Sequence, residues 1–178
     1  GQGRKAQLEA FEVKNGVKGA VISAVDLIKG IGILAKMDVI EVEGATGYID
    51  TNFDGKAAAC IKAFENNDLV YVHVEAPDEC GHRGEVQNKV RSIEIIDEKI
   101  LGPVKAALNK MGPHRIMILP DHPTPLAIKT HSSDPVPYLI YDSEKSEAGV
   151  DVFTEATAKA TGNYLDKGYQ LMDQLTGK

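Results

Sequence analysis

The feature that most constrains the fold is a repeated alternation of short apolar runs with longer stretches of helical periodicity. The short runs are rich in β-branched side chains, and the longer stretches carry apolar residues three and four positions apart. Strands that alternate with crossover helices form a parallel sheet, because each helix returns the chain to the same end of the sheet. We therefore predict an α/β fold in which a largely parallel sheet is sandwiched between helices.

The expected elements follow in order along the chain. Strands are predicted at 20–24, 38–43, 69–74, 115–119 and 137–141. Helices are predicted at 25–37, 54–64, 84–109 and 154–175, with Asp54 and Thr154 as N-caps of two of them. The run 69–74 has the composition of a central strand covered on both faces. In the helix at 84–109, five apolar residues predict one face that packs on the sheet: Val86, Val90, Ile93, Ile96 and Ile100.

Length, composition and charge exclude several classes of protein. The 178 residues correspond to about one domain, or to a piece of a larger one, and 43% apolar residues predict a buried core. The 20 basic and 26 acidic side chains give a net charge of −6, so we expect no nucleic-acid partner. No apolar run reaches the roughly 18 residues of a membrane span. Cys60 and Cys80 are too few for a disulfide framework and favour a cytoplasmic protein.

Acidic and histidine side chains cluster beside the ends of predicted strands. Asp78 and His82 lie four positions apart in a polar loop after the run 69–74. Asp121 and His122 follow the strand at 115–119, and His131 precedes the strand at 137–141. Open α/β sheets place their functional sites at the carboxyl ends of strands. These residues are therefore candidates for one site.

The chemistry of these side chains points to divalent metal ions. Two carboxylates and three imidazoles suit Mn²⁺ or Zn²⁺, with Co²⁺ or Mg²⁺ as further options, and are more than one tetrahedral site with an open position needs. Two ions about 4 Å apart can clamp the attacking and leaving oxygens of a phosphoryl group. We therefore predict a substrate that is a phosphate ester or a similar oxyanion. His73, inside a predicted strand, and His114, in a turn, are not ligand candidates.

Five stretches stand in a fixed order along the chain: VDLIKGIG, EGATGYIDTNFDGKA, VHVEAPDECGHRG, ILPDHPTPL and THSSDPVPYLIY. Together they resemble the C-terminal portion of the archaeal-type 2,3-bisphosphoglycerate-independent phosphoglycerate mutases, which belong to the alkaline phosphatase superfamily. The resemblance covers nearly all of the chain. It implies an alkaline-phosphatase-like core with a bimetallic site at the strand ends.

The resemblance also implies roles for individual residues. One ion would be held by Asp78, His82 and His131, and the other by Asp121 and His122. The family interconverts 3-phosphoglycerate and 2-phosphoglycerate, in glycolysis and gluconeogenesis, through a phosphoserine intermediate. Lys29 is similar in position to a phosphate-contacting lysine of the family, and the start of a helix favours a bound anion.

The nucleophilic serine of the family, a further aspartate ligand and an inserted substrate-binding domain lie in segments that precede the part resembled here. We therefore expect residues 1–178 to be the C-terminal portion of a catalytic domain, inactive alone, whose partner is the N-terminal remainder of the same polypeptide. Thr124, Ser132 and Ser133 are the hydroxyls nearest the ligand motifs. Because each lies beside a proline or in a turn, a capping role is favoured over a nucleophilic one.

Two other functions remain open on the sequence. One is a different metal-dependent phosphotransferase or phosphatase of the same superfamily, since metal ligands are shared while substrate contacts lie elsewhere. The other is a non-catalytic metal-binding or interaction module that keeps the fold.

Overall fold

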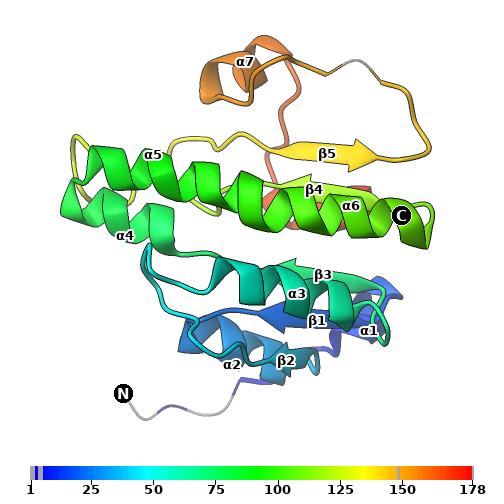
Figure 1. The fold of residues 1–178 in the computed structure, drawn as a ribbon. Coiled ribbons are helices and arrows are strands. Elements are labelled where there is room, and N and C mark those ends of the chain that lie inside the picture. Colours follow the sequence, from blue (N-terminus) through cyan, green and yellow to red (C-terminus); the bar gives the residue numbers. More distant parts are fainter. Residues whose placement is uncertain (1–2, 4–5, 148, 178) are drawn as a thin grey trace.

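The computed structural model describes residue 3 and residues 6–147 and 149–177. Three parallel strands form the centre of the fold, in the order β2 (Asp38–Ile40), β1 (Gly19–Ile22) and β3 (Leu69–Val72). The crossovers are α2 (Asp26–Leu34) and α3 (Phe53–Ala63) (Figure 1). Every residue of β1 is buried, because β1 alone of the three has a strand on each side.

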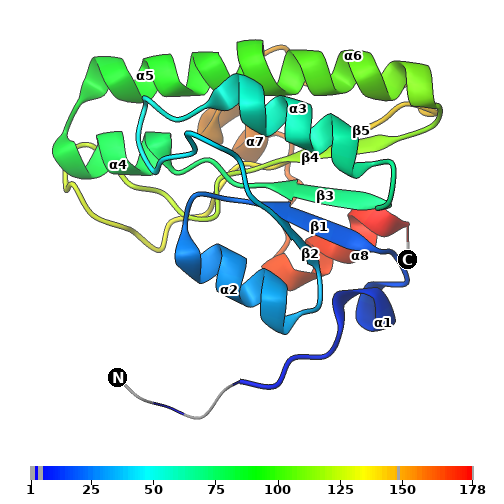
Figure 2. The same cartoon turned by 60° about the horizontal axis from the view of Figure 1, so that its bottom comes forward.

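A second pair of strands lies beyond β3. β4 (Arg115–Ile118) and β5 (Leu139–Asp142) are antiparallel, with Ile116 opposite Tyr141 (Figures 1 and 2). The arrows of β3 and β4 point the same way in Figure 1, so the carboxyl ends of both strands lie toward the same edge. The predicted α/β fold with a largely parallel sheet between helices is confirmed, with this antiparallel pair at one side.

Helices cover both faces of the strands. Figure 2 shows α3, α5 (Val86–Ile95) and α6 (Gly102–Met111) over one face, and α1 (Phe11–Asn15), α2 and α8 (Leu171–Thr176) under the other. A π-helical segment, η1 (Ile96–Leu101), joins α5 to α6. The main core lies between the sheet and the helices α3, η1 and α6. Its buried residues are Ile22, Phe53, Ala57, Cys60, Ala76, Ile100, Val104 and Leu108.

The predicted polar loop after β3 is instead a helix, α4 (Ala76–Arg83). Pro77 stands in its first turn, where a missing N–H costs nothing, and Gly84 closes the helix in the left-handed conformation at φ 70°. The correction matters for the site. Asp78 and His82, four residues apart, lie on one face of a rigid helix rather than in a loop.

The prediction that five apolar residues of the long helix pack on the sheet is only partly confirmed. Ile100 is buried and Ile96 packs against the core, but the exposed fractions of Val86, Val90 and Ile93 are 56%, 52% and 55%. The helix also contains the π-helical turn η1, whose extra residue rotates the following turns. The apolar stripe of α5 therefore does not continue into the buried stripe of η1 and α6.

Three smaller predictions also need correction. The helix predicted at 154–175 is broken into α7 (Glu155–Ala160), the 3₁₀ turn η2 (Gly168–Gln170) and α8, although Thr154 caps α7 as expected. Asn52, not Asp54, caps α3 through its side chain. β3 is not covered on both faces, since Tyr71 is 41% exposed.

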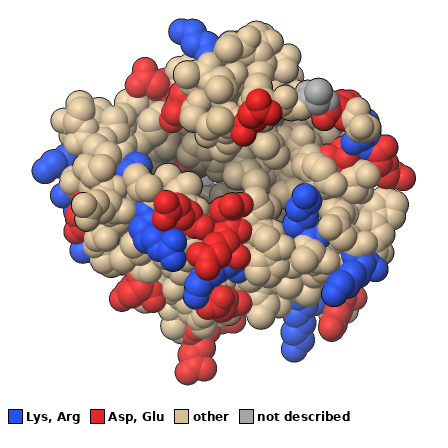
Figure 3. All heavy atoms as spheres, turned by 45° about the horizontal axis from the view of Figure 1, so that its top comes forward, with Lys and Arg blue, Asp and Glu red and all other residues tan. Residues whose placement is uncertain are grey.

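The surface carries charges of both signs. On the face shown in Figure 3, the Lys and Arg side chains of the described residues are scattered among Asp and Glu and form no continuous basic area. Within the described part of the chain, no helix combines the length and the apolar character that a membrane crossing requires.

Candidate metal centre

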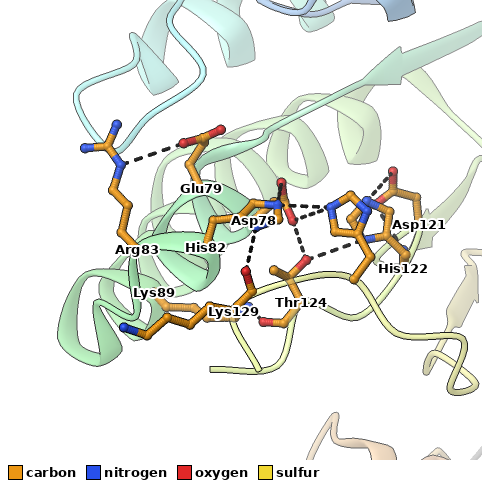
Figure 4. Close-up of polar contacts among 10 residues, drawn as sticks. Asp78, Glu79, His82, Arg83, Lys89, Asp121, His122, Thr124 and Lys129 are labelled. Carbon is orange, nitrogen blue, oxygen red and sulfur yellow. Dashed lines mark hydrogen bonds and ion pairs between the residues drawn. The ribbon is translucent and has the colours of Figure 1, made fainter. Parts of the chain in front are cut away.

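The structure brings together the five acidic and histidine residues singled out in the sequence. Asp78 and His82 come from α4, while Asp121 and His122 come from the segment between β4 and β5 (Figure 4). His131 belongs to the same segment. Oxygen and nitrogen atoms of Asp78, His122 and His131 lie within 4.8 Å of one another. These are residues far apart in the sequence that meet at the carboxyl ends of β3 and β4.

Asp78 lies at the middle of this cluster. Its Oδ2 is 3.3 Å from Nε2 of His82, and its Oδ1 is 3.4 Å from Nε2 of His131. The two Nε2 atoms are 3.1 Å apart. Two imidazole nitrogens and a carboxylate directed at one point are the donor set that Zn²⁺ and Mn²⁺ accept.

His82 is held by a hydrogen bond at Nδ1, the ring nitrogen that faces away from Asp78. Nδ1 lies 3.0 Å from the backbone oxygen of Lys129, which can only accept a hydrogen bond, so Nδ1 carries the proton. Nε2 of the neutral ring then keeps its lone pair for a metal ion. Lys129 itself has φ 53°, a left-handed conformation that costs a non-glycine residue energy. The strained residue is thus the one that fixes the tautomer of His82.

The other two candidates, Asp121 and His122, lie beside Asp78, His82 and His131. The rings of His122 and His131 have centroids 3.8 Å apart. Asp121 Oδ2 is 3.6 Å from Nε2 of His122, and Asp121 Oδ1 accepts a hydrogen bond from the His122 N–H at 3.1 Å. Asp121 and His122 therefore form a second pair of donors directly beside the first three.

Thr124 belongs to the site, although its sequence context favours only a turn-capping role. It is 4% exposed, and its hydroxyl donates a hydrogen bond to Asp78 Oδ1. Since its proton is used there, Oγ1 can only accept from Nδ1 of His122, which lies 3.4 Å away. Thr124 thus links the helix to the loop and leaves Nε2 of His122 free for a ligand role.

Removing the Thr124 hydroxyl should weaken metal binding without unfolding the protein. Thr124→Val keeps the shape of the side chain but breaks both contacts, so Asp78 and His122 lose an outer-shell partner. We expect a loss of about 10–100-fold in Zn²⁺ affinity, measured by calorimetry. Thr124→Ser keeps the hydroxyl and should stay near wild type. Equal affinities in the two variants would show that the hydroxyl does not orient the ligands.

The loop that carries Thr124 is held on α4 by a close backbone contact. Lys89 Nζ donates to the Thr124 carbonyl oxygen at 2.8 Å, and a Cβ on Gly81 would lie 2.8 Å from that oxygen. Only glycine permits this approach. Gly81 is therefore part of the candidate site, because it lets the Thr124 segment lie against α4, although it contacts none of the five candidate ligands.

Further carboxylates surround Asp78. Oxygen atoms of Glu75, Asp78 and Glu79 lie within 4.8 Å of one another. Burial raises the pKa of Glu75, and repulsion from Glu79 and Asp78 raises it further. A bound cation would relieve this repulsion, so the electrostatics of this edge also favour a metal ion.

Lys29 stands outside the cluster. Its ammonium group lies 3.2 Å from Asp26 and 3.3 Å from Glu41. The hydrogen bonds that Lys29 donates to the Asp26 and Glu41 carboxylates raise its pKa, so it stays charged. The structure places Lys29 on α2, which follows β1, but shows no contact between it and the five candidate ligands.

Comparison with known proteins decides the family. A family model described as the metalloenzyme superfamily matches residues 1–175. The chain belongs to this superfamily. A 2,3-bisphosphoglycerate-independent phosphoglycerate mutase from Methanosarcina mazei is 52% identical over 98% of the chain and 45% of its own length. The predicted resemblance to the C-terminal portion of these mutases is confirmed.

Two solved structures share the fold of this chain. The PH0037 protein from Pyrococcus horikoshii matches with a TM-score of 0.78 and 28% identity, over 94% of this chain and 51% of that one. A cofactor-independent phosphoglycerate mutase from Thermoplasma acidophilum matches with a TM-score of 0.71 and 26% identity, over 96% and 39%. The chain spans 44–45% of the length of the first curated relatives that it matches.

Proposed function

We propose that this chain is the metal-binding portion of a cofactor-independent phosphoglycerate mutase, which interconverts 3-phosphoglycerate and 2-phosphoglycerate. The observation that carries the proposal is the convergence of Asp78, His82 and His131, with Nε2 of both histidines directed at the carboxylate. Relatives about half identical to this chain bear the name of that enzyme. The cluster gives this portion a chemical role in the whole protein.

The ligands would divide between two ions, Mn²⁺ or Zn²⁺. Asp78, His82 and His131 would hold the first, and Asp121 and His122 the second. The close contact between the His122 and His131 rings, whose centroids are 3.8 Å apart, supports two neighbouring positions rather than distant ones. Such ions supply Lewis acidity that neutralises charge on a transferring phosphoryl group. Lys29 would contribute a further positive charge toward a phosphate on the β1–α2 side.

The second ion needs ligands from elsewhere, because two protein donors are fewer than a catalytic ion uses. We assign these ligands and the nucleophilic serine to the N-terminal remainder of the same polypeptide. Among the described residues, β3 pairs only with β1 and β4 only with β5, so each strand keeps one free edge. A further strand could pair there and end beside Asp121. Cys60 and Cys80 are free thiols, which supports a reducing cytoplasm as the working compartment.

A coupled assay for conversion of 3-phosphoglycerate to 2-phosphoglycerate tests the proposal. The chain alone, loaded with Mn²⁺, should show no turnover, because the nucleophilic serine is assigned to the N-terminal remainder of the polypeptide. The complete polypeptide should turn over. Turnover by the chain alone contradicts the missing nucleophile. A complete polypeptide that hydrolyses phosphate monoesters but leaves phosphoglycerate unchanged indicates another phosphatase of the superfamily.

A further inference from the structure

The outer face of α2 is an apolar surface that no described element covers. The exposed fractions of Leu27, Ile31 and Ile33 on this face are 70%, 47% and 62%. Of the nine residues of α2, all of them described, only Gly32 is buried. An amphipathic helix usually buries its apolar side chains, so a helix that leaves three large ones exposed is expected to have a further partner.

The two charged residues of α2 do not break up this surface. Asp26 and Lys29 form an ion pair of 3.2 Å with each other. The Lys29 ammonium also lies 3.3 Å from Glu41, in the segment after β2, and the Lys29 side chain is only 20% exposed. Its charge is therefore directed toward the β2 side of the helix. Leu27 and Ile31, four positions apart, thus form a continuous apolar strip.

Gly30 lies on the same face, between Leu27 and Ile33 in the helical spacing. Beyond its own helix backbone, no described heavy atom is within 4 Å of the place where its Cβ would be. Glycine inside a helix costs stability, and no contact of the described chain requires it at this position. A segment that approaches the helix backbone closely would require it. The glycine is thus a second observation that points to a packing partner.

The segment through which the chain enters the fold lies beside this face. The N–H of Phe11 donates a hydrogen bond at 2.7 Å to the carbonyl oxygen of Ala35, the residue after α2. Residues 6–10 run next to the second half of α2 in both Figure 1 and Figure 2. The chain matches the C-terminal portion of curated relatives and spans 44–45% of their length, so in those relatives a longer stretch of polypeptide leads into this segment. Such a stretch arrives beside α2.

We propose that the outer face of α2, formed by Leu27, Gly30, Ile31 and Ile33, is the docking surface for the polypeptide that directly precedes this chain in the complete protein. The inference rests on the proposed function, which makes this chain the C-terminal portion of a longer enzyme. α2 follows β1, whose carboxyl end lies at the same edge of the sheet as that of the parallel strand β3. The docked polypeptide is thereby held beside the edge at which the candidate ligands lie.

Labelling of one introduced thiol measures this cover directly. In the chain alone, Leu27→Cys should react with a water-soluble maleimide as an exposed thiol does, whereas Cys60 and Cys80 are buried. In the complete polypeptide its rate should fall by about tenfold or more, because labelling then requires local opening of the interface. Mass spectrometry of the labelled peptide measures both rates. Lys110→Cys, at an exposed position of α6, is the control and should react equally fast in the two proteins.

A pair of glutamines tests the contribution of the surface to stability. Leu27→Gln and Ile31→Gln together remove the apolar strip but keep good helix-forming residues. The melting temperature of the chain alone should not fall, because both side chains are exposed there. That of the complete polypeptide should fall by about 2–4 °C or more, because the two polar side chains would be buried in the interface. An unchanged melting temperature of the complete polypeptide contradicts the inference.

The remaining outcomes separate this inference from the proposed function. If analytical ultracentrifugation shows that the chain alone forms a dimer that Ile31→Gln dissociates, the occupant is a second copy and the inference is wrong. If Leu27→Cys is protected in a complete polypeptide that does not convert 3-phosphoglycerate, the docking surface stands and only the proposed function is contradicted. If the complete polypeptide is an active mutase in which Leu27→Cys reacts as fast as in the chain alone, the inference alone is overturned.

Discussion

Replacing Asp78 by asparagine is expected to abolish tight binding of the first divalent ion while leaving the fold in place. The Asp78 carboxylate is the only anionic group in the ligand set proposed for that ion, and it contacts both His82 and His131. The substitution removes one ligand and the negative charge together. We expect the Mn²⁺ or Zn²⁺ affinity to fall by more than the roughly 100-fold upper cost of losing an outer-shell partner. Calorimetry on the chain measures this loss.

A histidine outside the cluster of candidate ligands, His114, provides the control for this loss of metal affinity. His114 lies just before β4, where its Nδ1 is 2.8 Å from the Gly112 oxygen, and it belongs to no group of candidate ligands. His114→Ala should leave metal affinity unchanged. Because asparagine has nearly the shape of aspartate, the melting temperature of metal-free Asp78→Asn should stay close to that of the wild type. Wild-type affinity in Asp78→Asn would show that the first ion is held elsewhere.

The order and type of the main elements follow from the sequence, because each strand and crossover helix has its own periodicity. The long apolar stripe of the helix after α4 shows the limit of that signal. Periodicity identifies a face but not what covers it, and the π-helical turn η1 breaks the continuity between Val90 and Ile100. The prediction of one continuous helix at 154–175 is wrong for a different reason. Gly162 and Gly168 weaken its middle, so only its two ends are helical.

Hydrophobic periodicity does not predict the helix α4, because its sequence has no apolar stripe. Its buried residues are the small side chains Ala76, Cys80 and Gly81, while its other positions are polar or charged. The signals that remain are those of its two ends. Pro77 and the acidic Asp78 and Glu79 mark the first turn, and Gly84 marks the end. A functional helix of this kind is identified by its ends rather than by its hydrophobic pattern.

The candidate ligands could be selected from the sequence because their chemistry is visible in single residues. The contacts that support them could not. Thr124 and Lys129 act through a hydroxyl or a carbonyl group that every threonine or backbone carries. Their roles depend on which residue the fold brings opposite them, and that information lies in the packing of α4 against the segment between β4 and β5.

The same packing predicts a large effect for a residue with no side chain. Gly81→Ala is expected to push the Thr124 loop away from α4, since the new Cβ would lie 2.8 Å from the Thr124 oxygen and 2.9 Å from its Cγ2. A backbone oxygen cannot move aside as a flexible side chain can. Overpacking of this kind costs about 1–3 kcal/mol of unfolding free energy. Zn²⁺ affinity should fall in parallel, because Thr124 would no longer reach Asp78. Thermal unfolding with and without Zn²⁺ measures both effects.

Gly30 is the matched control for this substitution. It lies inside α2, and no heavy atom is within 4 Å of the place where its Cβ would be. Gly30→Ala should therefore stabilise the protein by about 0.5–1 kcal/mol, because alanine loses less backbone freedom in a helix. The two glycine substitutions are thus expected to have opposite signs. If Gly81→Ala also raises the melting temperature and keeps full Zn²⁺ affinity, the loop does not rest on α4, and the assignment of Thr124 to the metal centre is wrong.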